Sequence, residues 1–311
     1  MPDAPLTPDK RRIEIDPDGV DPPPRAPFVE LGLVSCFSFL RGSSDAVDLV
    51  TTARMLGYDA LGIADANTMA GVVRIHTEAK TLKLRPVIGC RIETVEGLAF
   101  LAYPKDRAAY GCLCRLISQG RMQTLSGKWQ EKGVCEIDLA MLADHAEDVQ
   151  LILLPPDDLD VRFTIAVPSN VIPFRHPSSE LQKGSVSPDQ VRGNDKVELT
   201  APFPRLLAHL TAQLPTLRHL AAAYLYRGDD IARIDRLDAM AREHGLSLLA
   251  TNDVHYHAAE RRPLNNVMTA IRHKTTVEAA GHLRRNDPPV RALAPCHHGI
   301  TRYRGCLHLQ S

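Results

Sequence analysis

Asp253 and His255 follow a short apolar run and form the residue pair in this sequence best suited to bind a metal ion. The run, residues 246–250, is typical of a buried strand, and in α/β proteins ligands commonly bind beyond the carboxyl end of a strand. On an extended backbone, side chains two residues apart share a face, so this carboxylate and imidazole could hold one ion. Alternatively, Asp253 caps a turn and His255 is an ordinary surface histidine, since two ligands rarely complete a site.

The elements that would position this pair alternate along the chain between short apolar strands and amphipathic helices. Strands are predicted at 28–35, 60–64, 85–90, 98–103, 150–154 and 246–250. Helices are predicted from Ser44 as N-cap and over 69–82, 106–118, 139–146, 205–213, 216–226 and 230–244. This alternation predicts an α/β fold with mostly parallel strands, and the number of elements suits a barrel.

Composition narrows the class of protein. Lys plus Arg and Asp plus Glu both number 37, so no global basic field indicates nucleic-acid binding. No apolar run approaches the roughly 18 residues that a membrane span requires, and the first residues are proline-rich and charged rather than apolar. Seven scattered cysteines are typical of reduced thiols. We therefore expect a cytoplasmic protein without a membrane partner.

Proline-rich stretches mark the expected domain boundaries. Residues 1–27 predict a disordered leader, because they combine many prolines with almost no apolar periodicity. A barrel domain is expected over 28–284, interrupted by an irregular insert at about 162–204. Residues 285–311 predict an irregular tail, since helical periodicity is lost after Pro288-Pro289.

Four segments together resemble the polymerase and histidinol phosphatase (PHP) domain of bacterial error-prone DNA polymerases, which belong to the DNA polymerase III alpha-subunit family. They occur in the family's order and cover about residues 28–160 and 217–284. The leader, the insert and the tail do not share the resemblance. The segments are VSCFSFLRG (34–42), ALGIADANTMAGVV (60–73), LAYPKDRAAYGCLCRL (101–116) and ATNDVHYHAAERRPL (250–264).

The resemblance implies a distorted seven-stranded α/β barrel of the PHP type, with up to three metal ions at the carboxyl ends of its strands. Several metal-binding positions of the family are substituted here. The His-x-His pair falls at Gly32 and Val34, and the histidine of the Asp-His motif falls at Ala66. The glutamate position falls at Arg91, a fixed cation where a metal site needs an anion.

Three candidate metal ligands remain from the resemblance, namely Asp65, Asp253 and His255, with His257 as a weak fourth. Hydrolytic metal sites lower the pKa of bound water and neutralise phosphate, typically with two or three ions. We therefore expect a degenerate site with no catalytic residue and no resident cofactor, although residual Zn or Mn binding stays open. Arg91 could pair with one of the aspartates and replace the metal's charge.

Function follows from the resemblance only in part. The family transfers nucleotides with paired carboxylates in a palm domain, and nothing after His282 resembles that domain. We expect a truncation or frameshift, and no DNA synthesis by this chain alone. The resemblance implies DNA repair and damage-induced replication, with DNA and other replication or mutagenesis proteins as partners; for this chain itself the sequence specifies none. The alternative is a stand-alone metal-dependent PHP phosphoesterase that uses the three remaining ligands, so whether the chain is an enzyme stays open.

Overall fold

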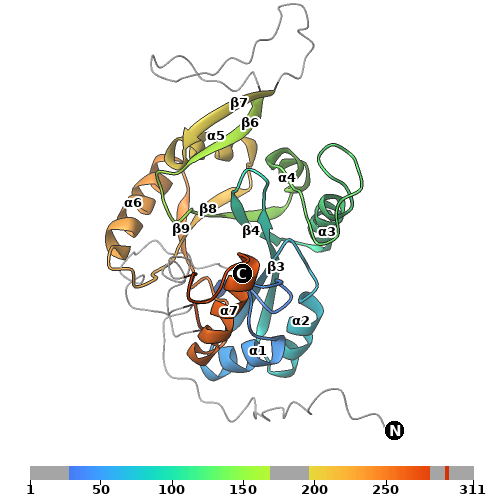
Figure 1. Cartoon of the computed structure of the whole chain (residues 1–311), viewed down its shortest axis with the longest axis vertical. Coiled ribbons are helices and arrows are strands. Elements are labelled where there is room, and N and C mark those ends of the chain that lie inside the picture. The colour runs from blue at the N-terminus through green and yellow to red at the C-terminus, as the bar shows by residue number, and fades with distance from the viewer. Residues whose placement is uncertain (1–27, 169–195, 281–290, 294–311) are drawn as a thin grey trace, which may run out of the picture. The chain divides into compact units, whose positions relative to one another are not determined.

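The computed structural model describes residues 28–168, 196–280 and 291–293, and these divide into two compact units. The first unit comprises residues 28–65, 70–88, 252–280 and 291–293. The second unit comprises residues 66–69, 89–168 and 196–251. The expected leader at 1–27 lies outside the described residues. Figure 1 labels the elements of both units.

Nine strands and seven α-helices make up the described residues. The strands are β1 Glu30–Leu33, β2 Ala60–Ala66, β3 Arg85–Glu93, β4 Ala99–Pro104, β5 Val149–Leu154, β6 Arg162–Pro168, β7 Lys196–Pro202, β8 Leu217–Ala222 and β9 Ser247–Ala250. The α-helices are α1 Ala46–Met55, α2 Val72–Thr81, α3 Arg107–Met122, α4 Leu139–His145, α5 Phe203–Gln213, α6 Asp230–Glu243 and α7 Arg262–Arg272. A 3₁₀ turn, η2 Ala259–Arg261, precedes α7.

Seven of these strands form one sheet with the order β1-β2-β3-β4-β5-β8-β9. The pairs β1–β2, β5–β8 and β8–β9 are parallel, whereas β4 is antiparallel to both β3 and β5. A seven-stranded sheet whose strands alternate with helices confirms the expected α/β fold class. Strand β4 turns back along β3 through the short turn at Gly97, so its two pairs are exceptions to the mostly parallel pairing that the sequence predicts.

Aspartates begin several helices, as the preference for short acceptor side chains at N-caps predicts. The carboxylates of Asp45, Asp106 and Asp138 accept backbone N–H groups in the first turns of α1, α3 and α4. The expected N-cap of α1, Ser44, lies one residue too early, because its hydroxyl contacts His257 instead. Within the described residues, no helix is long and apolar enough to cross a membrane.

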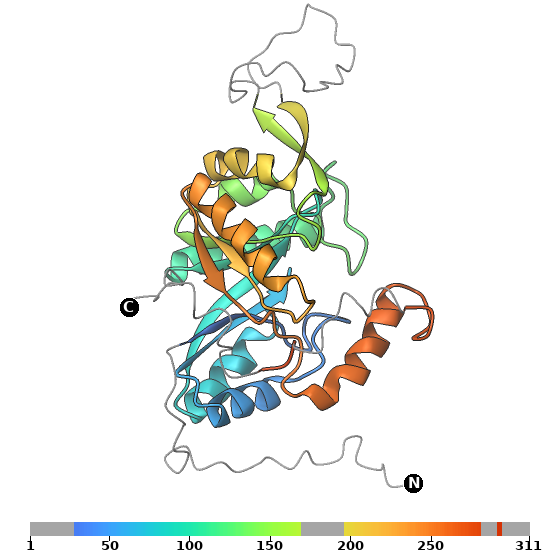
Figure 2. The same cartoon turned by 90° about the vertical axis from the view of Figure 1, so that its left-hand side faces the viewer.

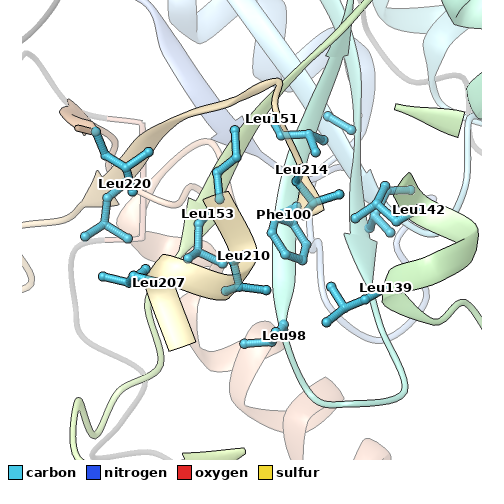
Figure 3. Close-up of a cluster of buried hydrophobic side chains, with 14 of the residues drawn as sticks. Leu98, Phe100, Leu139, Leu142, Leu151, Leu153, Leu207, Leu210, Leu214 and Leu220 are labelled. Atoms are coloured by element: carbon cyan, nitrogen blue, oxygen red, sulfur yellow. The ribbon is translucent and has the colours of Figure 1, made fainter. Parts of the chain in front are cut away.

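Leucine side chains build the core of the second unit. They come mainly from β5, β8, α4 and α5, with Leu98 from the turn before β4, and Figure 3 shows several of them around the ring of Phe100. Phe100, Leu151, Leu153, Leu210 and Leu220 are fully or almost fully buried. Strand β8 was wrongly predicted as part of a helix at 216–226. Its leucine and alanine content favours a helix locally, but pairing with β5 and β9 fixes it as a strand, since tertiary context overrides propensity.

The insert expected to be irregular at 162–204 is ordered at both described ends. Strands β6 and β7 pair antiparallel over their whole lengths, and Figures 1 and 2 show this pair beside α5. Phe163 contacts Phe203 of α5 edge to face, which ties the pair to the core of the second unit. Residues 169–195 lie outside the described residues, so the expectation of irregular structure stands untested there.

Candidate metal centre

Asp65 ends the buried part of β2 and is held by hydroxyl and amide donors of the loop after β1. The Ser35 amide donates to Oδ1 at 2.7 Å and the Ser35 hydroxyl to Oδ2 at 2.8 Å. The Ser38 hydroxyl donates to Oδ1 at 2.6 Å. Both serines and Asp65 are buried. These donors therefore occupy lone pairs that a metal ion would need.

The surroundings of Asp65 favour its protonated form more than water does. Burial raises the pKa of this carboxyl above its ordinary value of 3.8, while the hydrogen bonds from Ser38 and Ser35 act in the opposite direction. Gly71 closes the space beside it, because a Cβ added there would lie 2.4 Å from Oδ2. Even a methyl group is thus excluded from this side of the carboxylate.

Asp253 and His255 are brought together, as the sequence predicts, but they face a cation of the chain itself. His255 Nε2 lies 3.9 Å from Asp253 Oδ1. The Arg291 guanidinium forms an ion pair with Asp253, and its Nη1 lies 2.8 Å from His255 Nε2. A guanidinium has only donors, so His255 Nε2 must accept and the imidazole is neutral with its proton on Nδ1.

The backbone at Asp253 differs from the extended conformation on which the pairing was predicted. Its φ is +47°, in the left-handed region that aspartate tolerates better than most residues. The argument that residues two apart share a face was therefore wrong in its geometry. The side chains of Asp253 and His255 nevertheless lie close together, and both contact the same nitrogen of Arg291.

Glu30 is a buried carboxylate that sequence reasoning missed. Its Oε1 accepts the Gly32 amide at 2.6 Å, and its Oε2 accepts the Asn252 amide at 2.7 Å. Glu30 thereby links β1 to the loop that carries Asp253. The signal was present in the sequence, since a glutamate inside the apolar run FVELGLV (28–34) must be paired when it is buried.

The substituted positions are filled by structural residues. Gly32 lies in β1 beneath Glu30, and the amide of the fully buried Val34 donates to the Val254 carbonyl at 2.9 Å. Ala66 and Arg91 belong to the second unit, where Arg91 is buried in β3. Because Asp65 and Asp253 belong to the first unit, pairing of Arg91 with either one stays a prediction.

His257, the weak fourth candidate, is engaged at the start of α1. Its Nδ1 lies 2.8 Å from the Ser44 hydroxyl, and its amide donates to the same oxygen at 3.0 Å. Asp48 Oδ2 is 3.8 Å away and also pairs with Arg261. Burial lowers the pKa of His257, and the nearby Asp48 opposes this shift. These contacts assign His257 to the packing of α1.

The donor set does not fit a resident divalent metal. A metal ligand must offer a free lone pair, yet Asp65 accepts three hydrogen bonds, while Asp253 and His255 both contact Arg291. Among the described residues, no three His, Cys, Asp or Glu side chains gather closely enough to hold an ion. The arrangement can bind a guanidinium and stabilise the carboxylates of Glu30, Asp65 and Asp253.

Comparison with known proteins agrees with the resemblance. Residues 30–164 match the PHP domain family model. The chain is 34% identical over 283 residues to the error-prone DNA polymerase of Brucella abortus biovar 1 (strain 9-941), covering 89% of this chain and 22% of that protein. It is 37% identical over 259 residues to the error-prone DNA polymerase of Bradyrhizobium diazoefficiens, covering 82% of this chain and 19% of that protein.

The chain thus spans about a fifth of the length of these relatives. Among solved structures, an amidohydrolase from Chromobacterium violaceum is similar with a TM-score of 0.47 and 11% identity, covering 73% of this chain and 87% of that one. The identities to the polymerases extend over most of this chain and include the PHP match. The chain is therefore a homologue of the part of error-prone DNA polymerases that carries the PHP domain.

Proposed function

We propose that this chain is a non-catalytic PHP module of the error-prone polymerase machinery, acting in the cytoplasm in DNA repair and damage-induced replication. The observation that carries this proposal is that donors of the protein itself contact all three would-be metal ligands. Asp65 accepts hydrogen bonds from the hydroxyls of Ser35 and Ser38, and Asp253 and His255 both contact the Arg291 guanidinium. A hydrolytic PHP site would need these lone pairs for its ions.

The partners proposed for this module are those of its relatives' class, namely DNA and other replication or mutagenesis proteins. The relatives are DNA polymerases by name, and this chain covers only 22% or less of the two described above. Their nucleotidyl transfer is a property of the whole proteins. We propose that this chain does not perform it alone, and that its contribution is structural.

The competing candidate is a stand-alone metal-dependent phosphoesterase that uses Asp65, Asp253 and His255. The proximity of Asp253 to His255, at 3.9 Å, is the observation in its favour. In this candidate a divalent ion would have to displace Arg291 from both side chains. It would also have to displace the serine donors from Asp65.

Hydrolysis and metal content separate the two candidates. The purified chain is supplied with Zn²⁺ or Mn²⁺ and assayed with p-nitrophenyl phosphate and with a single-stranded DNA primer, beside an Asp253→Ala variant. The proposal predicts the same background rate for both proteins and less than one tightly bound ion per chain. About two bound ions per chain, together with hydrolysis that disappears in Asp253→Ala, would establish the phosphoesterase instead.

A further inference from the structure

Residues 291–293 form a short extended segment that is hydrogen-bonded to the loop after β9. The His255 and Tyr256 amides both donate to the Arg291 carbonyl, at 2.8 and 3.3 Å. The Leu293 amide donates to the Tyr256 carbonyl at 3.1 Å, and Tyr256 and Ala292 form a parallel bridge. These three residues belong to the irregular tail expected at 285–311; they form one isolated bridge and no regular strand, and the rest of the tail lies outside the described residues.

Apolar packing supports the same segment. Leu293 is 6% exposed and joins the core of the first unit, which also contains Val254, Leu33, Leu61 and Ile63. Removal of this leucine side chain from water stabilises the docked segment. The segment is thus held by backbone hydrogen bonds and by a buried side chain on the same stretch that carries Asp253 and His255.

The Arg291 side chain uses this anchoring to reach both candidate ligands. It is 13% exposed, against 17% for Asp253 and 13% for His255, so the contacts are largely shielded from water. One nitrogen, Nη1, serves the carboxylate and the imidazole together. Its two hydrogens match these two acceptors, which requires the neutral Nδ1–H tautomer of His255.

We infer that the Asp253 carboxylate and the His255 imidazole form a binding site for a guanidinium cation, filled in this chain by Arg291, whose main-chain carbonyl is held by the His255 and Tyr256 amides. The Asp253 carboxylate and the His255 imidazole accept hydrogen bonds from the cation, and the weaker hydration of a guanidinium suits this largely shielded site better than the strongly hydrated ammonium of lysine. This inference goes beyond the proposed function, because it assigns a ligand class to the two residues and a role to a segment of the tail. It does not depend on whether the relatives' partners bind this chain.

Chemical rescue tests the inference. Arg291→Ala is compared by thermal unfolding with the wild type and with Arg85→Ala, a matched control on an exposed arginine of the same unit. Loss of the guanidinium leaves Asp253 largely buried without its cation, so the expected decrease in Tm is about 5 °C or more, against about 1 °C or less for the control. Methylguanidinium at low millimolar concentration should recover most of the loss in Arg291→Ala. It should not raise the Tm of the wild type or the control.

Arg291→Lys and NMR keep the test decisive if the alanine variant does not fold. The lysine variant keeps the charge but lacks the planar donors, so its Tm should lie between those of the wild type and a folded Arg291→Gln variant. In the wild type, ¹⁵N shifts should show His255 protonated on Nδ1 and unprotonated on Nε2. An Nε2–H tautomer, or a Tm of Arg291→Ala equal to that of Arg85→Ala, would overturn the inference, as would a folded alanine variant that methylguanidinium does not rescue.

Discussion

Asp65 and Asp253 are both aspartates of the first unit at positions where the PHP resemblance implies metal ligands, yet they are stabilised by different means. Asp65 accepts hydrogen bonds from neutral donors, the hydroxyls of Ser35 and Ser38 and one amide. Asp253 instead pairs with a cation, Arg291, contributed from 38 residues further along the chain. The donors are remote along the chain in both cases, 27 to 30 residues from Asp65 and 38 residues from Asp253, so the two sites differ in the charge of the donor.

The difference indicates that two kinds of donor can stabilise the same type of largely buried carboxylate. Neutral hydroxyls compensate for the lost hydration of a buried carboxylate only in part, which agrees with the raised pKa of Asp65. A guanidinium adds opposite charge and fixed geometry, so it also defines the state of the neighbouring His255. The Asp65 site should therefore respond to pH, and the Asp253 site to ionic strength.

The largest effect is expected when the Asp65 carboxylate is removed. Asp65→Ala leaves the Ser35 amide and the hydroxyls of Ser35 and Ser38 buried without their acceptor. Each unsatisfied donor costs about 1–3 kcal/mol, so we expect the free energy of unfolding to decrease by about 3–5 kcal/mol in urea denaturation. Asp59→Ala, on an exposed aspartate of the same unit, should change it by less than about 0.5 kcal/mol. Equal effects of the two variants would contradict the role of Asp65.

A methyl group at Gly71 should have the next largest effect. Its Cβ would lie 2.4 Å from Asp65 Oδ2 and 2.9 Å from the Ser35 hydroxyl, and three hydrogen bonds prevent that carboxylate from moving freely. We expect Gly71→Ala to lower the free energy of unfolding by about 1–3 kcal/mol. The control is Gly111→Ala in α3, where the nearest atom is 3.7 Å away and the helix should gain up to about 1 kcal/mol. If Gly71→Ala left the free energy of unfolding unchanged, the side chains around Asp65 would have room to move away from the added methyl group.

A smaller effect is expected from pH, because the pKa of Asp65 is raised by burial against the hydrogen bonds of Ser38 and Ser35. The folded state then holds the proton more tightly than the unfolded state. The resulting stabilisation is complete below pH 3.8 and is lost as pH rises through the higher folded pKa. Asp65→Asn cannot ionise, so its free energy of unfolding should increase relative to that of the wild type as pH rises from 3.8 through the folded-state pKa of Asp65. Urea denaturation of both proteins from pH 4 to pH 8 measures this difference. If the free energy of unfolding of the wild type instead rose relative to that of Asp65→Asn with increasing pH, the hydrogen bonds would outweigh burial.

The smallest expected effect is the difference between the two sites in how salt changes the stabilisation that each donor contributes. The stabilisation from Arg291, measured as the wild type minus Arg291→Gln, should decrease measurably, by roughly 0.3–0.5 kcal/mol, between 0.05 and 0.5 M NaCl; the decrease is small because the pair is largely buried. The stabilisation from the Ser38 hydroxyl, measured as the wild type minus Ser38→Ala, should stay constant, since this donor carries no charge. Equal salt dependence of both differences would remove the distinction between the sites.

Apolar periodicity and strand-end motifs predicted most of the fold and the location of the site. The alternation of strands and helices was predicted correctly except in two places. Strands β6 and β7 lie where an irregular insert was expected, and the alanine- and leucine-rich β8 favours a helix until it pairs on both sides. The proximity of Asp253 to His255 was also predicted. Their occupant was not, because Arg291 lies in a segment without periodicity and its contacts depend on the folded chain. Glu30 could have been recognised as a buried carboxylate, but its acceptance of the Asn252 amide is a long-range contact that no local pattern reveals.

The most direct test of the claim that protein donors have replaced the metal is the metal dependence of thermal unfolding. The chain is treated exhaustively with a chelator, and its Tm is then measured with increasing Zn²⁺ or Mn²⁺, beside Asp253→Asn. The account predicts that neither chelation nor added metal changes the Tm of the wild type by more than about 1 °C. A saturable increase of several degrees that disappears in Asp253→Asn would show that a metal ion binds there, and would contradict the account.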